Sequence, residues 1–498
     1  MSRHESFLDF KADKKAIVKN AVNSVVIQVI FRMKGLITMP IMTYYLLPKE
    51  MGVFSLLVIT VHLLTPLFSM NLISGPAVFL IQEKSKDRIR AMYYTAFNSA
   101  IVFSSVCILC LGLILQGWGG KYRAYWVLLC PMLASNLVYQ LFSSILVNFQ
   151  KTSILVKISF FKDFATVLLT IFLVMAGFSY YGMAAAIIFT DLLAGAYIYG
   201  KLKDELPYQL TMNRGLLKDF LRISLPLLPV YLFNWMIQSS DSYFLAQLKG
   251  EAIVGKYSVI YGLSNVILIF TYALNLFWIP LSVRLWTEDK AKYQKAFKFV
   301  FAAFSTFLLM AVILFEFNSK LIMRIMVKKP DYQDAYIIMG IIAFAFALSV
   351  LVTLLTAPLY SDQKPRLIFW SYLLGSGFNL ILNFCLIPRY GILGAALATA
   401  SSYLLIVVAM SYFLFKFLGF HFIDRRLLYV GIGFIVVWAG AASLREIFLT
   451  PQVVAADIAF LLSMGLIVYG FILKGEERSY LVSLGKEFLG KKGKPAGL

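Results

Sequence analysis

Long apolar runs, each about the length needed to cross a membrane, follow one another along the whole sequence. At ~1.5 Å rise per residue, about 20 apolar residues span the hydrocarbon core as a helix. Charged residues or turn signals separate fourteen such runs, which predict an all-α polytopic membrane protein of about 14 transmembrane helices. The runs are roughly 21–46, 51–81, 91–116, 124–149, 154–177, 181–200, 221–247, 252–284, 296–323, 333–360, 366–388, 391–415, 427–448 and 453–473.

The composition supports a membrane protein. Of the 498 residues, 60% are hydrophobic and only 14% are charged, which is too apolar for a soluble chain of this size. The polar and basic N-terminal segment 1–20 lacks the apolar core of a cleavable signal. The net charge of +21 is interpreted as charge retained on cytoplasmic loops, so we expect no nucleic-acid partner.

The basic residues divide unequally between the two sides of the predicted membrane. The side that carries both termini holds 33 Lys and Arg residues, counting Lys151, Lys157 and Lys162 at one loop, against nine on the opposite side. Because cytoplasmic loops carry the excess of Lys and Arg, both termini are predicted to be cytoplasmic.

The runs repeat. Three pairs of similar segments lie about 203, 213 and 209 residues apart, so spans 1–6 and 7–12 are predicted to be two parallel, pseudo-symmetric six-helix lobes around a central cavity. The first pair begins at Tyr45 and Phe244 and aligns Gly52 with Gly255, an offset of 203, and the other two pairs begin at Gln150 and Gln363 and at Tyr181 and Tyr390. The predicted divisions are an N-lobe at 1–204, a C-lobe at 205–420, two further spans within 421–475 and a basic cytoplasmic tail at 476–498.

Two cations near the middle of the first span are the most unusual polar residues. Arg32 shares a helix face with Gln28, whereas Lys34 lies roughly 200° away. A cation at this depth costs roughly 2.5–3.5 kcal/mol on insertion scales. Either the two cations face an aqueous cavity that an anion can enter, or they form a buried ion pair between helices.

Polar stripes on other spans supply further candidate substrate-binding residues. Neutral amides and tyrosines suit hydrogen bonding and stacking with a sugar chain, and their alternative role is hydrogen bonding between helices. The candidates are Asn136, Gln140, Asn234, Gln238, Tyr257, Tyr261 and Asn379.

Three acidic residues within spans are candidates for ion coupling. Asp241 continues the face of Asn234 and Gln238, and Glu316 and Asp191 lie within other spans. For Asp241 and Glu316, pairing with a neighbouring group is the alternative to carrying an ion. His62, alone in its span, is interpreted as a packed histidine rather than a proton relay.

Signatures of an enzyme are absent from the sequence. It has no phosphate-binding Walker loop, and its three histidines lie far apart. The four cysteines fall inside predicted spans and are interpreted as packing residues. We therefore expect no catalytic residues, no metal and no cofactor.

Three segments resemble the polysaccharide-transporter (Wzx-type oligosaccharide flippase) family of the multidrug/oligosaccharidyl-lipid/polysaccharide exporter superfamily. The first is NSVVIQVIFRMKGLITMPIMTYYLLPKEMGVFSLL from Asn23. The second is SLPLLPVYLFNWMIQSSDSYFLAQLKGEAIVGKYSVIYGLSNVI from Ser224, and the third is YGILGAALATA from Tyr390.

The resemblance implies translocation of an undecaprenyl-pyrophosphate-linked oligosaccharide across the cytoplasmic (inner) membrane for surface polysaccharides such as O-antigen or exopolysaccharide. Arg32 and Lys34 would then attract the pyrophosphate while the two lobes rock. Membrane lipids, a polysaccharide polymerase and glycosyltransferases are the implied partners. The alternatives are a cation-coupled multidrug exporter and a membrane-embedded polymerase or ligase, although no predicted outer loop exceeds about a dozen residues.

Overall fold

The computed structural model describes residues 35–72, 79, 83, 85–117, 123–149, 151–422 and 425–444. All regular elements within these residues are helices, which confirms the predicted fold class. Residues 35–45 are also helical and continue the first predicted span.

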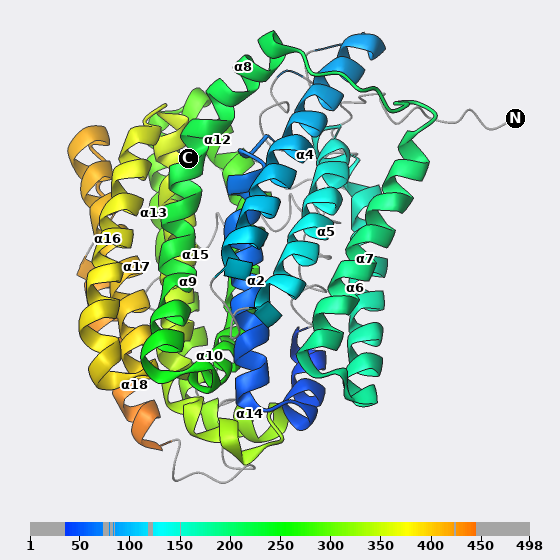
Figure 1. Ribbon diagram of the computed structural model, residues 1–498. Coiled ribbons are helices and arrows are strands. Elements are labelled where there is room, and N and C mark those ends of the chain that lie inside the picture. The colour runs from blue at the N-terminus through cyan, green and yellow to red at the C-terminus, as the bar shows by residue number, and fades with distance from the viewer. Residues whose placement is uncertain are drawn as a thin grey trace, which may run out of the picture.

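Figure 1 shows the helices packed side by side along one common direction. The first half comprises α2 (Pro48–Phe68), α4 (Lys86–Gly117), α5 (Arg123–Asn148), α6 (Thr152–Leu173) and α7 (Ser179–Leu202). The helix α8 (Arg214–Ser224) follows, and the second half comprises α9 (Leu228–Lys249), α10 (Glu251–Ser264), α11 (Ile269–Ala273), α12 (Ile279–Glu288), α13 (Lys290–Phe317), α14 (Ser319–Met326), α15 (Met339–Ser361), α16 (Pro365–Tyr390), α17 (Ile392–Leu418) and α18 (Arg425–Leu444).

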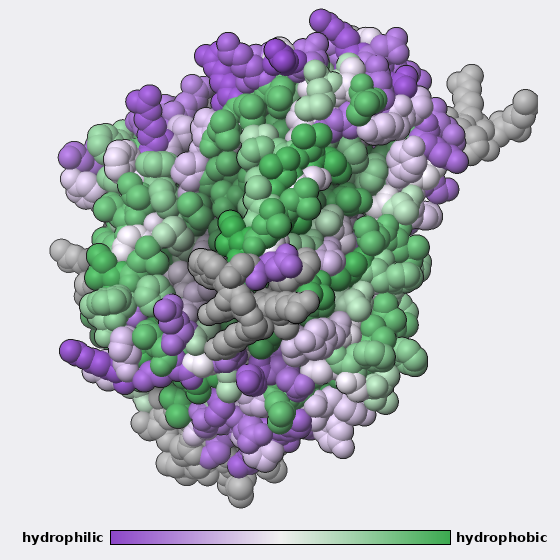
Figure 2. Space-filling view, viewed as in Figure 1, coloured by the Kyte–Doolittle hydropathy of each residue, from purple (hydrophilic) through white to green (hydrophobic). Residues whose placement is uncertain are grey.

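The molecule has the surface of a membrane protein. Figure 2 shows hydrophobic side chains covering its middle, with hydrophilic side chains concentrated towards both ends. Ten helical stretches of the described residues are long and apolar enough to cross a membrane, and one of them, Ile154–Leu202, contains both α6 and α7. The chain is therefore a multi-pass membrane protein, while the number of 14 spans stays a prediction.

We name the two ends of the molecule by the short helices that lie there (Figure 1). The α8 end also holds the first residues of α4 and α13. The α14 end holds the first residues of α2 and α10.

The turns α6–α7 and α16–α17 share the backbone conformation of one residue, although a π-helical kink at Val174–Phe178 precedes only the first turn. Ser179 has φ 50° and ψ −140°, and Gly391 has φ 55° and ψ −126°. Three residues later, an added Cβ on Gly182 would lie 2.8 Å from Leu173 Cβ, and one on Gly394 would lie 2.5 Å from the Leu386 carbonyl oxygen. The two turns are therefore equivalent at an offset of 212 residues (391 minus 179), which confirms the pseudo-symmetry.

This geometry corrects one of the predicted pairings. The sequence motif aligns Tyr181 with Tyr390, an offset of 209, but structural equivalence shifts the register by three residues. The motif misleads because Gly391 forms the turn, whereas Gly182 already lies inside α7.

Two predicted spans are more interrupted than the apolar pattern indicates. The seventh span, 221–247, contains the last residues of α8, a 3₁₀ turn at Leu225–Leu227 that includes Pro226, and most of α9. The eighth span, 252–284, contains α10, α11 and α12 with 3₁₀ and π turns between them.

The segment that joins the halves, 203–213, is fastened to α4. Leu206 of this segment and Phe220 of α8 are both fully buried in the hydrophobic core of the first half. Three side chains of α4 donate hydrogen bonds to backbone carbonyls of the segment: Arg90 Nε to Pro207 O (2.8 Å), Tyr94 Oη to Leu206 O (2.8 Å), and Asn98 Nδ2 to Gln209 O and Thr211 O (3.0 Å each). In the other direction, Asn213 N donates to Thr95 Oγ1 of α4 (3.3 Å). This packing argues that the predicted boundary at 204/205 lies later, near Leu225.

Candidate transport site

Asp241 is the centre of a buried polar cluster in the second half. Its side chain is fully buried on α9, and its carboxylate accepts hydrogen bonds from Tyr257 Oη of α10 (2.5 Å), Thr399 Oγ1 of α17 (3.2 Å) and Ser242 N (2.7 Å). Each of these donors is neutral. Because a buried charge is costly unless it is compensated, this site favours uptake of a proton or a small cation.

Amide groups extend this cluster between α9 and α16. Ser240 Oγ donates to Asn379 Oδ1 (3.1 Å), and Asn383 Nδ2 donates to Ser240 Oγ (3.1 Å) and to Asn379 Oδ1 (2.9 Å). Within the described residues, Asn383 Oδ1 and Asn379 Nδ2 are buried without a hydrogen-bond partner. The cluster therefore offers carboxylate, amide and hydroxyl oxygens, the ligand type that hard cations prefer.

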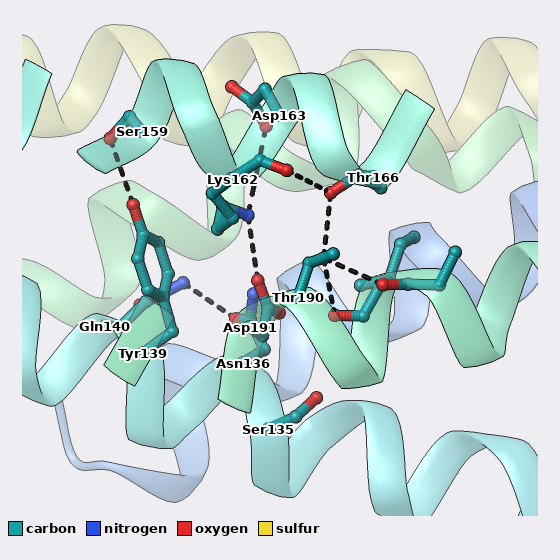
Figure 3. A network of polar contacts seen from close by, with 12 residues as sticks. Ser135, Asn136, Tyr139, Gln140, Ser159, Lys162, Asp163, Thr166, Thr190 and Asp191 are labelled. Atoms are coloured by element: carbon teal, nitrogen blue, oxygen red, sulfur yellow. Dashed lines mark hydrogen bonds and ion pairs between the residues drawn. The ribbon is translucent and has the colours of Figure 1, made fainter. Parts of the chain in front are cut away.

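An ion pair occupies the middle of the first half (Figure 3). Lys162 Nζ of α6 lies 2.8 Å from Asp191 Oδ1 of α7 and 3.9 Å from Asp163 Oδ1. The ammonium also stands 4.6 Å from the centre of the Tyr139 ring, whose hydroxyl is 3.0 Å from Ser159 Oγ. Asp191, a predicted ion-coupling residue, is thus paired with a cation, while its Oδ2 has no partner in the described part of the chain.

Lys162 is not a loop residue as the charge count assumes. Its side chain is 16% exposed, and it lies about ten residues into α6. The predicted span 154–177 already includes Lys162, so the charge count places in a loop a cation that the apolar run places in a helix. One cation therefore leaves the cytoplasmic count, and the bias remains large.

The predicted amides of α5 lie beside this ion pair. Gln140 Nε2 donates to Asn136 Oδ1 (2.8 Å), which also accepts from Thr65 Oγ1 of α2 (3.3 Å). Figure 3 shows Gln140, Asn136, Asp191 and Lys162 grouped between α5, α6 and α7. The structure thus brings three of the predicted site residues together in the first half.

The other predicted substrate-binding residues of the second half contact side chains on their own helix or on a neighbouring helix. Gln238 Nε2 donates to Asn234 Oδ1 (3.2 Å) on the same face of α9, as the spacing predicts. The Tyr257 ring lies 5.9 Å from that of Tyr261, which makes an edge contact with Phe346 (4.8 Å between centroids).

Glu316 lies apart from both clusters. It is 2% exposed on α13, where Trp438 Nε1 of α18 donates to its Oε2 (3.2 Å). Its carboxylate covers Gly340 so closely that an added Cβ would lie 1.8 Å from Oε2. The contacts of Glu316 therefore join α13, α15 and α18.

Gln28, Arg32 and Lys34 lie outside the described residues. The interpretation of the first span as a cavity wall therefore remains a prediction.

The two halves meet at the α14 end through a reciprocal pair of glycines. An added Cβ on Gly52 of α2 would lie 1.8 Å from the Glu251 carbonyl oxygen, and one on Gly255 of α10 would lie 1.8 Å from the Pro48 carbonyl oxygen. The starts of α2 and α10 thus cross with their backbones in direct contact, which only glycine permits.

Hydrogen bonds between the halves continue from this crossing towards the middle. At the α14 end, Tyr332 Oη donates to Leu46 O (3.2 Å) and Lys329 Nζ to Tyr45 O (3.2 Å). Along α2 and α9, Thr60 Oγ1 and Tyr243 Oη lie 2.5 Å apart, Trp235 Nε1 donates to Ile59 O (3.1 Å) and Tyr231 Oη donates to His62 O (2.7 Å). These bonds link the two halves along α2 from the α14 end as far as His62.

Several residues of the two clusters were not among the predicted candidates: Lys162, Ser240, Asn383 and Thr399. Asn383 had a signal, because it continues the stripe of Ser376 and Asn379 at helical spacing. Ser240 and Thr399 had none, since single hydroxyl residues are frequent in membrane helices.

The described residues form two pseudo-symmetric halves of membrane-spanning helices, and each half holds a buried polar cluster. A family model described as "Polysaccharide biosynthesis protein" matches residues 17–286, more than half of the chain. The chain belongs to this family, which confirms the predicted relationship.

Solved structures share the fold at low sequence identity. "Lipid II flippase MurJ, inward closed conformation" aligns with a TM-score of 0.69 at 13% identity, over 91% of this chain and 100% of that one. A multidrug resistance MATE family transporter in an inward-facing conformation aligns with a TM-score of 0.58 at 13% identity, over 85% and 99% of the two chains. A MOP superfamily transporter from Pyrococcus furiosus aligns with a TM-score of 0.56 at 14% identity, over 86% and 98%.

One curated relative matches in sequence. It is an uncharacterized membrane protein of Methanocaldococcus jannaschii, MJ1068, 23% identical over 268 residues and 53% of this chain. The matched region spans about half (51%) of that relative.

Proposed function

We propose that this protein is a flippase that moves a lipid-linked oligosaccharide, carried on undecaprenyl pyrophosphate, across the cytoplasmic membrane for polysaccharide biosynthesis. Membership of the polysaccharide biosynthesis family supports the cargo class. We place the α8 end and both termini in the cytoplasm, because the excess of Lys and Arg lies on that side.

The observation that carries the mechanism is the crossing of Gly52 and Gly255. The backbone contact seals the α14 end, and it joins residues from opposite halves. In this account the halves separate there to release cargo outside and reform the contact to reset, which is alternating access between two lobes.

We place the hinge at the 3₁₀ turn Leu225–Leu227. The segment before it is held to α4 by hydrogen bonds, so 203–224 moves with the first half. The turn itself contains Pro226, and Pro229 opens α9. A short turn between two rigid helices accommodates a change of angle more readily than a segment that is held in place by hydrogen bonds.

Asp241 is the proposed coupling residue. It is a buried carboxylate with neutral donors only, and it bridges α9, α10 and α17. Loading and release of a proton or small cation there changes the packing of three helices that belong to the same half. Arg32 and Lys34 remain the proposed anchors of the pyrophosphate, with Gln140 and Asn136 among the proposed contacts of the sugar.

A cation-coupled multidrug exporter is the second candidate. The buried carboxylate of Asp241, which has no cationic partner among its hydrogen-bond donors within the residues that the structure describes, is what such a transporter needs, and the MATE family transporter shares the fold. The two proposals differ in the charge of the cargo, since an anionic pyrophosphate requires cations at the middle of the membrane and a cationic drug requires free carboxylates.

The deciding experiment uses purified protein in proteoliposomes. We expect it to move a fluorescent undecaprenyl-pyrophosphate oligosaccharide between leaflets, measured by access of an external quencher, and to leave a cationic dye gradient unchanged. Arg32→Ala is expected to stop cargo movement with insertion preserved. Movement of the dye alone would replace the flippase proposal with the exporter. In the genome, glycosyltransferases and a polysaccharide polymerase encoded beside this chain would support the cargo.

A further inference from the structure

A groove on the outside of the second half runs between α9 and α16 near the α14 end. Its volume is about 710 Å³, within the range of ligand pockets in proteins. Phe244 and Leu248 of α9 and Phe384 and Pro388 of α16 form its apolar walls. Leu248 is 46% and Phe384 72% exposed, so the walls are open to whatever surrounds the protein.

Positive charge lies where the groove reaches the end of the helices. Arg389, the penultimate residue of α16, lines the groove, is exposed, and has no hydrogen bond or ion pair within the described residues. Lys249 lies beside it and donates one hydrogen bond, to Pro388 O (2.9 Å), which leaves two ammonium protons for another acceptor. An apolar groove with two cations at its end fits a phospholipid, whose acyl chain lies along the apolar walls and whose phosphate contacts the cations.

The pseudo-symmetry indicates that this charge is not needed for the fold. At the offset of 212 residues that the two turns give, Arg389 corresponds to Gly177 in the first half. The equivalent turn forms there without a cation. Arg389 therefore serves something particular to the second half.

Both walls belong to one half, which decides the class of occupant. A path for cargo in a two-lobed transporter opens and closes between lobes. The groove between α9 and α16 stays within one packed unit, and the same two helices are joined by the hydrogen bonds of Ser240 with Asn379 and Asn383. Its occupant is thus a resident lipid rather than cargo in transit.

We propose that this groove binds one anionic phospholipid, with an acyl chain along Phe244, Leu248 and Phe384 and the phosphate on Arg389 and Lys249. The lipid supports the contact of α9 with α16 that holds Asn379 and Asn383 in place. The proposal stands on the groove alone and is independent of the cargo.

Cys385 lines the groove and is exposed, which gives the protein its own reporter. The test uses a variant with Cys107, Cys110 and Cys130 replaced by alanine, in vesicles of phosphatidylcholine with or without phosphatidylglycerol in both leaflets. We expect phosphatidylglycerol to slow labelling of Cys385 by an uncharged maleimide several-fold. Arg389→Gln is expected to abolish the slowing, and Arg389→Lys to keep it.

Two controls separate a specific site from a general effect of the lipid. A variant that retains only Cys110, exposed on α4, is expected to label at the same rate in both vesicles. Arg366→Gln removes an exposed cation at the other end of α16 and is expected to leave the slowing of Cys385 unchanged. Equal labelling of Cys385 in both vesicles, or slowing that persists in Arg389→Gln, would overturn the proposal.

Discussion

Asp241 and Lys162 show two different ways of holding a charge inside a membrane protein. Asp241 receives hydrogen bonds from neutral groups, whereas Lys162 lies against the carboxylate of Asp191. In the 212-residue repeat, Asp191 corresponds to Tyr403, a buried tyrosine (403 minus 191). The ion pair is thus particular to the first half.

Removing the charge of Asp241 is expected to uncouple transport. Asp241→Asn keeps the size of the side chain and its acceptor oxygen but cannot take up a proton or balance a cation. We expect the transport rate to lose its dependence on an imposed pH or sodium gradient. The measurement is cargo movement in proteoliposomes under each gradient, with Ser242→Ala as control for the local hydrogen bonds. A gradient dependence that survives Asp241→Asn would exclude this residue from coupling.

Breaking the Lys162–Asp191 pair on one side is expected to destabilise the protein. A buried charge without its partner costs about 3–5 kcal/mol, and removing both charges relieves that cost. Lys162→Gln and Asp191→Asn should each lower the melting temperature in detergent, and the double variant should recover much of the loss. Additive losses in the double variant would show that the two side chains do not act as a pair.

Residue roles were only partly accessible from the sequence. Helical spacing alone places Gln140 beside Asn136 and Gln238 beside Asn234, and both pairs form. The partner of Asp241 on α17 could not be predicted, because Thr399 is far away in sequence and packing between helices brings the two together.

At the scale of helices, the crossing of α2 and α10 is the contact that can least accept a larger side chain. Gly52→Ala would place a methyl group on the Glu251 carbonyl, so the α14 end could not close as it does here. We expect cargo movement to fall to background while the protein still inserts. Gly200→Ala, on α7 with nothing within 4 Å of the added carbon, is the matched control and should be silent. Full activity of Gly52→Ala would exclude this crossing as the gate.

The helices themselves follow from the apolar runs, but their interruptions do not. The predicted seventh span begins at 221, inside α8, and continues through Pro226, so the apolar pattern marks neither the start of α8 nor the turn before α9. The turns within 252–284 are set by neighbouring helices, for which the local sequence has no clear marker.

At the scale of the molecule, the repeat in the sequence was sufficient to predict two parallel halves. The register of one repeat was wrong by three residues, since a glycine can form a turn or a close helix contact, and the motif does not distinguish them. The structure adds that the halves touch at the α14 end, which no single-chain pattern indicates.

The separation of the halves at the α14 end is the central claim and can be measured directly. Spin labels at Tyr44→Cys and Ile325→Cys, exposed positions in opposite halves, report that end after the four native cysteines are replaced. A second pair, at Arg88→Cys and Leu210→Cys, reports whether the joining segment stays with α4. During turnover with lipid-linked oligosaccharide, we predict a longer-distance population for the first pair and a constant distance for the second. A first pair that stays at one short distance while cargo crosses the membrane would contradict the account.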